Sequence, residues 1–129
     1  MSENTRISNY MEKHLSPSLI EKLEACAFRS LCQHLKDHSN EVQNIDLMTV
    51  SGFCRNCLAK WIVTAARDLS SSLSQETVDA EEGVGMEIRA LNALGYDEAA
   101  QHVYGCNYGD WKKKHAKKAS DEQMKKYND

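Results

Sequence analysis

Two cysteines, Cys54 and Cys57, stand three residues apart in the segment SGFCRNCLAKW, and their spacing gives the chain its clearest chance of chemistry. In a helix, positions i and i+3 lie on one side, so both thiolates can reach one tetrahedral metal ion at about 2.3 Å, the usual zinc–sulfur distance. The spacing therefore predicts a site for zinc or another divalent metal. Such a site needs two further ligands.

Histidines near this segment are the first candidates for the missing ligands. His34 borders the apolar stripe of the first predicted helix, and His38 shares its face four residues later. Asp46 can supply a carboxylate oxygen. A second pair, His102 and Cys106, is also four residues apart and offers another place for a metal. We take Cys54, Cys57 and His34 as the predicted metal ligands.

The cysteine pair has two other interpretations. If a helix restarts near Phe53, Cys54 lies in its first turn, where free amides, the helix dipole and Arg55 stabilise a thiolate suited to redox chemistry. The residues before it do not form the strand of a βαβ unit, which argues against a thioredoxin-like enzyme. In the third interpretation, both cysteines are small buried side chains that pack along a helix. We favour packing first, metal second and redox last.

The cysteines fall on an apolar seam of the second predicted helix, for which Asp46 is the expected cap. The seam residues are Leu47, Val50, Cys54, Cys57, Leu58, Trp61 and Ala65. Gly52 costs about 1 kcal/mol against alanine within a helix, so it indicates either a close helix approach or a break. Arg55 and Asn56 are polar and lie between the cysteines. We expect them to face solvent or a partner chain and, with Asp46, to be binding residues.

The fold predicted from the periodicity is all-α, a compact bundle of five or six helices. Ser16 caps the first helix, Pro17 is its first residue, and it ends near residues 37–40. Later helices are expected over residues 86–94, 97–104, 108–118 and 121–127. Gly95 and Gly105 should end the first two of these in the left-handed conformation. Ser120 and Gln123 should form a capping box on the last one.

One helical domain over residues 16–129 is expected, because a chain of 129 residues has room for a single core. Residues 1–15 are mostly polar, and we expect a loose N-terminal arm or a short frayed helix there. Residues 70–84 are serine-rich and then acidic, which predicts a long surface connection that can include one helical turn.

Composition narrows the class and the compartment of the protein. With 41% hydrophobic and 27% charged residues, it is typical of a soluble globular domain. No apolar run is long enough for a membrane span, and the N-terminus lacks the apolar region of a secretory signal, so a cytoplasmic location is expected. Five cysteines, an odd number without an export signal, argue against a disulfide framework.

The lysine-rich C-terminal segment raises the question of nucleic-acid binding. Its lysines are Lys112, Lys113, Lys114, Lys117, Lys118, Lys125 and Lys126. The net charge of the whole chain is −3, and acidic residues are interspersed, so a solvated helical face is favoured over a phosphate-binding surface. Tyr108 and Trp111 should dock this segment onto the core, with Trp61 as a neighbour.

Several motifs together resemble a known family. They are VQNIDLMTVSGFCRNCLAKW at residues 42–61, Tyr104-Gly105, Tyr108 and Trp111-Lys112. The chain resembles, over about residues 25–68 and 100–124, a small, mainly bacterial domain family of unknown function numbered 1244. The resemblance implies a compact helical domain without an assigned activity. Where the family has Tyr-Gly-Met-Pro-Tyr, this chain has Cys106 and Asn107, and its insert over residues 70–100 is longer. A site at His102 and Cys106 would therefore be particular to this chain.

No glycine-rich phosphate loop, Gly-x-Ser-x-Gly elbow or apolar-framed carboxylate pair occurs in the sequence, so it carries no catalytic signature and leaves enzymatic activity open. We predict a small cytoplasmic, non-enzymatic binding or interaction module with a metal-binding Cys-x-x-Cys. Its partner is a second copy, as a homodimer, or another protein. The alternatives are a purely structural or assembly protein with core cysteines and a thiol-redox protein.

Overall fold

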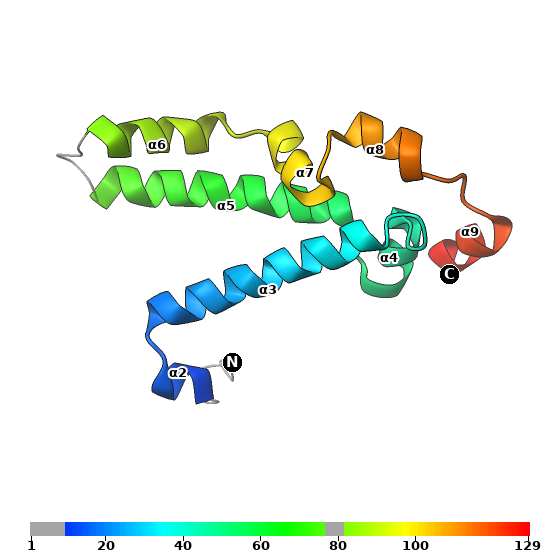
Figure 1. Cartoon of the computed structure of the whole chain (residues 1–129), viewed down its shortest axis with the longest axis horizontal. Helices are drawn as coiled ribbons and strands as arrows, with labels where there is room; N and C mark the ends of the chain where they lie inside the picture. Colours follow the sequence, from blue (N-terminus) through cyan, green and yellow to red (C-terminus); the bar gives the residue numbers. More distant parts are fainter. Residues whose placement is uncertain (1–9, 77–81) are drawn as a thin grey trace. The chain divides into compact units, whose positions relative to one another are not determined.

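The computed structural model describes residues 10–76 and 82–129, and all regular structure in these ranges is helical (Figure 1). The described helices are α2 (Tyr10–His14), α3 (Pro17–Asp37), α4 (Asn44–Ser51), α5 (Arg55–Glu76), α6 (Glu82–Ala93), α7 (Tyr96–Tyr104), α8 (Tyr108–His115) and α9 (Asp121–Asn128). The all-α prediction is confirmed. Eight described helices exceed the predicted five or six, because the expected second helix is split in two and a short helix precedes the first.

Contacts divide the chain into two compact units, Met1–His34 and Leu35–Asp129. The first is described from residue 10 and contains α2 and most of α3. The Ser16 hydroxyl accepts a hydrogen bond from the Leu19 amide at 3.2 Å, which confirms the predicted start of α3. Part of the predicted N-terminal arm is therefore helical, in α2, and residues 1–9 lie outside the described residues.

A sharp break separates α4 from α5. Gly52 has φ 79° and ψ 4°, the left-handed conformation that favours glycine, and its amide donates to the Met48 carbonyl at 3.0 Å. Of the two alternatives that the sequence left open at Gly52, a close helix approach or a break, the structure shows the break. Asp46 is not the cap residue that we predicted: it lies in the first turn of α4, where its carboxylate accepts from the Gln43 amide at 2.9 Å.

Helix α5 is longer than the sequence pattern predicts. It runs through the serines of the expected surface connection and ends at Glu76, and α6 begins at Glu82; residues 77–81 of that connection lie outside the described residues. The serines are not all solvated. Ser70 is buried, and its hydroxyl donates to the Asn92 side chain of α6 at 2.8 Å. A buried hydrogen bond thus holds α5 to α6 within the segment that the sequence predicted to be a surface connection.

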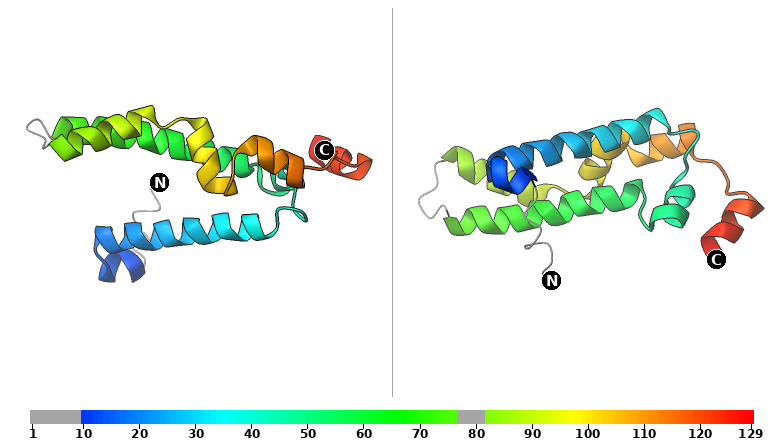
Figure 2. Two further views of the ribbon diagram at one scale, coloured as in Figure 1. Left: turned by 45° about the horizontal axis from the view of Figure 1, so that its top comes forward. Right: turned by 90° about the horizontal axis from the view of Figure 1, so that it is seen from below.

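The second unit is built around α5, against which α6 and α7 pack (Figure 2). Its buried apolar residues include Leu58, Ala59 and Ala66 on α5 and Ala99, Ala100 and Val103 on α7. Small side chains on both helices let the backbones approach closely. Helix α8 packs on α7, and α9 packs on α4, where the Gln123 side chain donates to Asp46 at 2.9 Å.

Helix ends in this unit are satisfied in different ways. Gly105 has φ 83° and ends α7 as predicted. Gly95 is instead extended, with φ −112° and ψ −176°, so the predicted left-handed end of α6 is wrong. The carbonyls at the end of α6 are satisfied by Arg67 of α5, whose guanidinium donates to Leu91 and Leu94 at 2.6 and 2.7 Å. The capping box of Ser120 and Gln123 on α9 is confirmed. None of the described helices has the length and apolarity that a membrane crossing requires.

Candidate functional site

The two cysteines lie at the start of α5. Cys54 directly precedes the first helical residue, and its carbonyl accepts from the amides of Cys57 and Leu58 at 3.0 and 3.3 Å. The alternative in which a helix restarts near Phe53 is therefore correct to within two residues, although Cys54 lies just before the first turn and not in it. Cys54 is buried, with 7% exposure, whereas Cys57 is half-buried, and both are free thiols.

Arg55 overturns the simplest expectation from the sequence. We predicted that it faces solvent or a partner chain, but only 1% of it is exposed. Its guanidinium donates to the Asn44 side chain at 3.1 Å and to the Leu35 carbonyl at 3.0 Å. It also lies over the ring of Trp111, with 5.1 Å between the Cζ atom and the ring centroid. Arg55 thus joins the start of α5 to the end of α3 and to α8.

The buried cation has an unusual environment, because no ion pair to a carboxylate forms at Arg55 within residues 10–76 and 82–129. Burial lowers the pKa of Arg55, and the nearby Tyr104 and Cys54 oppose that effect. Arginine nevertheless keeps its charge in proteins. Amide, carbonyl and aromatic groups therefore replace a counter-ion here, at a cost in solvation that only a tightly held geometry can offset.

A chain of hydrogen bonds continues from Arg55 across α4, α5 and α7. Asn44, which accepts from Arg55, donates to the Tyr104 hydroxyl at 3.1 Å. Tyr104 donates to the Asn56 side chain at 2.5 Å, and Tyr96 donates to the same oxygen at 2.6 Å. Asn56, which we expected to face solvent or a partner, is thus half-buried and engaged. We call Asn44, Arg55, Asn56, Tyr96 and Tyr104 the polar cluster.

Burial changes the ionisation of the phenols in the polar cluster. It raises the pKa of Tyr104, an effect that the hydrogen bond from Asn44 only partly offsets, and it also raises the pKa of Tyr96. Both hydroxyls therefore stay protonated and act as donors to Asn56. The cluster is a set of neutral partners around a single cation, with no group positioned as a general base.

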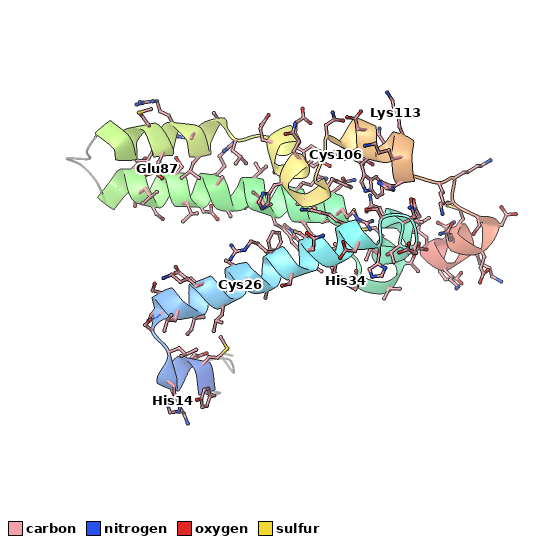
Figure 3. The ribbon with its side chains drawn as sticks, viewed as in Figure 1. His14, Cys26, His34, Glu87, Cys106 and Lys113 are labelled. Atoms are coloured by element: carbon pink, nitrogen blue, oxygen red, sulfur yellow. The ribbon has the colours of Figure 1, made fainter. Side chains whose placement is uncertain are left out.

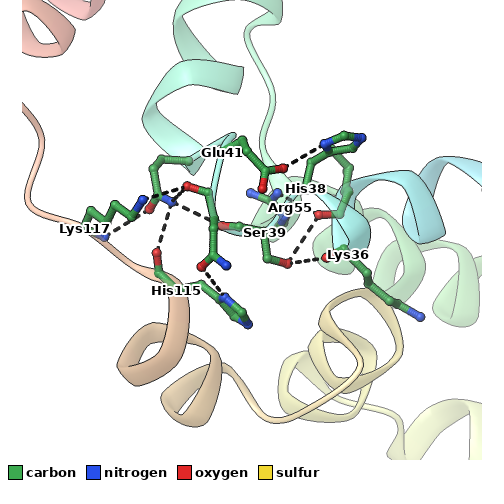
Figure 4. A network of polar contacts seen from close by, with 10 residues as sticks. Lys36, His38, Ser39, Glu41, Arg55, His115 and Lys117 are labelled. Carbon is green, nitrogen blue, oxygen red and sulfur yellow. Dashed lines mark hydrogen bonds and ion pairs between the residues drawn. The ribbon is translucent and has the colours of Figure 1, made fainter.

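Trp111 of α8 packs against the polar cluster, which confirms the prediction that it docks this segment onto the core. It is 2% exposed, its indole N–H donates to the Ser39 hydroxyl at 3.2 Å, and its ring centroid is 4.9 Å from that of Tyr104. Next to it, the Gln43 side chain donates to the His115 carbonyl at 3.0 Å and accepts from the Lys117 amide at 3.1 Å (Figure 4). These contacts hold the segment after α8 against the start of α4.

The predicted metal ligands do not form a recognisable centre. Within the described ranges, no three His, Cys, Asp or Glu side chains gather closely enough to hold a metal ion. His34 is exposed at the end of the first unit (Figure 3). Cys54 and Cys57 belong to the second unit. Asp46 is held by Gln43 and Gln123. The zinc site at Cys54, Cys57 and His34 stays a prediction that rests on residue spacing.

The second predicted pair is also separated in environment. His102 is exposed in the last turn of α7, whereas Cys106 is half-buried beyond the left-handed Gly105, at the turn into α8 (Figure 3). Among the residues that the structure describes, this pair is not part of a group of three side chains that could hold a metal ion.

Three apolar residues of the predicted seam point outward instead of inward. Val50 is 87% exposed, Trp61 is 55% exposed and Ala65 is exposed, so their predicted places on a buried face are wrong. Trp61 is also not the neighbour of Trp111 that we expected; it pairs with Phe53, at 5.8 Å between ring centroids. We call Phe53 and Trp61 the aromatic patch.

Sequence reasoning missed most of the polar cluster. Asn44, Tyr96 and Tyr104 were not candidates, because isolated polar and aromatic residues on two separate helices, α4 and α7, carry no pattern. One signal was present: counted from the break at Gly52, Arg55 shares a helical phase with Ala59, Ala66 and Ser70, all of which are buried.

Fold and site together define a small all-α domain whose interior is held by a polar cluster around one arginine. The chain belongs to the family of proteins of unknown function DUF1244, which matches residues 42–89 and 85–129. The resemblance to this family is thereby confirmed over residues 42–129. This match includes residues 69–99, which lay outside the predicted resemblance, and it does not include residues 25–41, which lay within it. A comparison with curated proteins found no match.

Proposed function

We propose that this protein is a non-catalytic interaction module that binds a second copy of itself through the aromatic patch. One observation carries the proposal: Trp61 is 55% exposed beside Phe53, whereas the other tryptophan is 2% exposed. Tryptophan is enriched among the residues that supply most of the energy of protein interfaces. An exposed tryptophan that is already paired with a second ring needs little ordering on binding.

The charges along α5 favour a second copy as the partner. Lys60, Trp61, Thr64 and Asp68 are all exposed, and at 100° per residue they lie within about 100° of arc on one face of the helix. If two α5 helices meet antiparallel with Thr64 near the two-fold axis, Lys60 of each copy lies opposite the partner's Asp68. The same surface is then complementary to itself, as a two-fold interface requires.

The polar cluster supports the non-catalytic part of the proposal. Each side chain of the cluster hydrogen-bonds to at least one other member. The buried Nε of Arg55 has no hydrogen-bond partner within the described residues, but Arg55 is too deeply buried to meet a substrate. Cys54 and Cys57 serve packing at the start of α5 in this proposal. Cys57 lies one helical turn before Trp61, on the same face.

Sedimentation velocity over a concentration series tests the proposal on the full chain. Wild-type protein should show a monomer–dimer equilibrium, and Trp61→Ala should weaken it at least about tenfold, which corresponds to 1.4 kcal/mol. Leu69→Ala is the matched control, because Leu69 lies on the same helix with 54% exposure but on another face. Wild-type protein that stays monomeric at every concentration, or equal weakening by both variants, contradicts the proposal.

A charge exchange tests the antiparallel arrangement independently. Lys60→Glu should weaken the dimer roughly threefold to tenfold, because each copy then presents a carboxylate, in place of the ammonium, to the partner's Asp68. Adding Asp68→Lys to the same chain should restore the wild-type constant. A double variant that associates as weakly as the single one would rule out this pairing.

A further inference from the structure

A small pocket lies between the start of α4 and α8, away from the aromatic patch. Its volume is about 180 Å³, and its walls come from Gln43, Asn44 and Ile45 before and in α4, from three residues of α8, and from the segment that follows α8. That is room for a tetrahedral oxyanion with a few further atoms.

The charge on the pocket walls has one sign. Lys112 and Lys117 are lining residues, and no lining residue is acidic. Asp46, which follows the lining residue Ile45, has both oxygens engaged, one with the Gln43 amide and one with the Gln123 side chain, each at 2.9 Å. The lining therefore offers two cations and no carboxylate.

Both lysines are held near the pocket by weak contacts that a ligand can replace. The Lys112 ammonium lies 4.7 Å from the centroid of the Tyr108 ring, and the Lys117 ammonium donates to the Asn40 carbonyl at 3.1 Å. Lysine carries a compact charge on a flexible stem, so both groups can turn onto a bound anion without a change in the backbone. The Tyr108 ring gives the pocket an apolar side.

Burial and hydrogen bonds hold other parts of the pocket wall in place. Trp111 is buried, and Gln43 fixes the segment after α8 through His115 and Lys117. A preformed cavity with a few convergent polar groups is the usual form of a small-molecule site. We propose that this pocket binds the phosphate group of a small soluble metabolite, with Lys112 and Lys117 as the anion-binding residues. The proposal is independent of self-association.

Nuclear magnetic resonance titration of the full-length protein tests this site. The probes are inorganic phosphate and glycerol 3-phosphate, each at constant ionic strength with chloride as the reference anion. The amides of Asn44 and Ile45 and the indole N–H of Trp111 should shift saturably, with a millimolar dissociation constant. Shifts that do not saturate, or that chloride reproduces, would overturn the proposal.

Lysine variants show whether the pocket or general surface charge is responsible. Lys112→Gln and Lys117→Gln should each weaken phosphate binding about tenfold, the effect of losing one charged contact. Lys113→Gln and Lys118→Gln are the matched controls: both lysines are exposed and outside the pocket, and Lys113 points away from α8 into solvent (Figure 3). Controls that weaken binding as much as the pocket variants contradict the site.

A second arm separates the sources of the phosphate group. Vesicles that contain phosphatidic acid present the same chemistry on a membrane surface. The proposal expects glycerol 3-phosphate to bind saturably and the vesicles not to sediment the protein. Sedimentation with the vesicles, without saturable binding of glycerol 3-phosphate, would assign the lysines to a lipid surface and overturn the proposal. Unchanged thermal unfolding of each variant shows that its fold is retained.

Discussion

The polar cluster and the aromatic patch lie within one stretch of chain, but they reverse the usual distribution of side chains. Arg55 is 1% exposed, whereas Trp61, six residues later on the same helix, is 55% exposed. Charged residues are almost never fully buried unless they are paired, and large apolar residues are usually inside. The solvation free energy that Arg55 loses on burial is offset by its hydrogen bonds to Asn44 and the Leu35 carbonyl and by its contact with the Trp111 ring.

The comparison indicates that the polar cluster stabilises the fold, whereas the aromatic patch is available for binding. The polar cluster ties α4, α5 and α7 together through directional hydrogen bonds, which fix the orientations of the helices more strictly than apolar contact alone. The aromatic patch lies on the surface, where a second molecule can reach it. Changes in the cluster should therefore reduce stability, whereas changes in the patch should reduce association and leave stability intact.

The largest expected effect is at Trp111. Trp111→Ala removes a ring that is 2% exposed and contacts Arg55, Tyr104 and Ser39, so we expect the free energy of unfolding to fall by about 4 kcal/mol. Urea unfolding followed by circular dichroism measures the loss. A loss below that of Trp61→Ala would show that α8 does not close the interior.

The hydroxyl of Tyr104 should matter less, but measurably. Tyr104→Phe leaves Asn44 and Asn56 each without one partner, and we expect a loss of about 1 to 2 kcal/mol in the free energy of unfolding. Tyr127→Phe is the matched control, because that ring is 48% exposed at the end of α9. Equal effects of the two changes would contradict a structural role for the Tyr104 hydroxyl.

The same hydroxyl gives a pH dependence whose sign is fixed. Burial raises the pKa of Tyr104 in the folded state above its unfolded value of about 10, so the unfolded chain releases this proton first. The contribution to stability is full below about pH 10 and is lost as pH rises from there towards the folded pKa. The stability difference between wild type and Tyr104→Phe should therefore shrink above about pH 10. A difference that grows there would contradict the burial of the hydroxyl.

The reactivity of the cysteine thiols should increase with their exposure. Cys26 is exposed and accepts a hydrogen bond from Arg29 at 3.1 Å, Cys57 is half-buried and Cys54 is buried. We expect labelling in that order, with Cys54 modified only on unfolding, as measured by mass spectrometry. Faster labelling of both Cys54 and Cys57 after chelation would instead support the zinc site that their spacing predicts.

The smallest expected effect on stability is at the aromatic patch. Trp61→Ala should change the free energy of unfolding of the monomer by no more than about 0.5 kcal/mol, as is usual for exposed positions. The measurement is urea unfolding at a concentration where sedimentation shows monomer. A large loss would place Trp61 in the interior and remove the basis of the proposed interface.

Much of the fold could be predicted from local signals. Ser16 with Pro17, Gly105, and Ser120 with Gln123 mark helix ends correctly, because capping depends on a few neighbouring residues. Gly95 misled, because its helix end is satisfied by Arg67, which is remote in sequence. The serines near residue 70 misled for the same reason: a partner on α6 accepts a hydrogen bond from Ser70.

The site could not be predicted by continuing the apolar stripe. The prediction assumed one continuous helix through Gly52. Three residues between α4 and α5 are not helical, so the buried positions of α5 do not continue the helical spacing of α4. Val50 and Trp61 therefore turn outward, and Arg55 turns inward. The acceptors that make the burial of Arg55 tolerable, Asn44 and the Leu35 carbonyl, are 11 and 20 residues away and carry no signal in the sequence.

The most direct test of a fold organised around a buried arginine is urea unfolding of Arg55→Ala beside Lys60→Ala, an exposed position on the same helix. We expect Arg55→Ala to lose about 3 kcal/mol of unfolding free energy, from the cavity it leaves and the hydrogen bonds lost at Asn44 and Leu35. Lys60→Ala should stay within about 0.5 kcal/mol of wild type. Equal stability of the two variants would contradict the account.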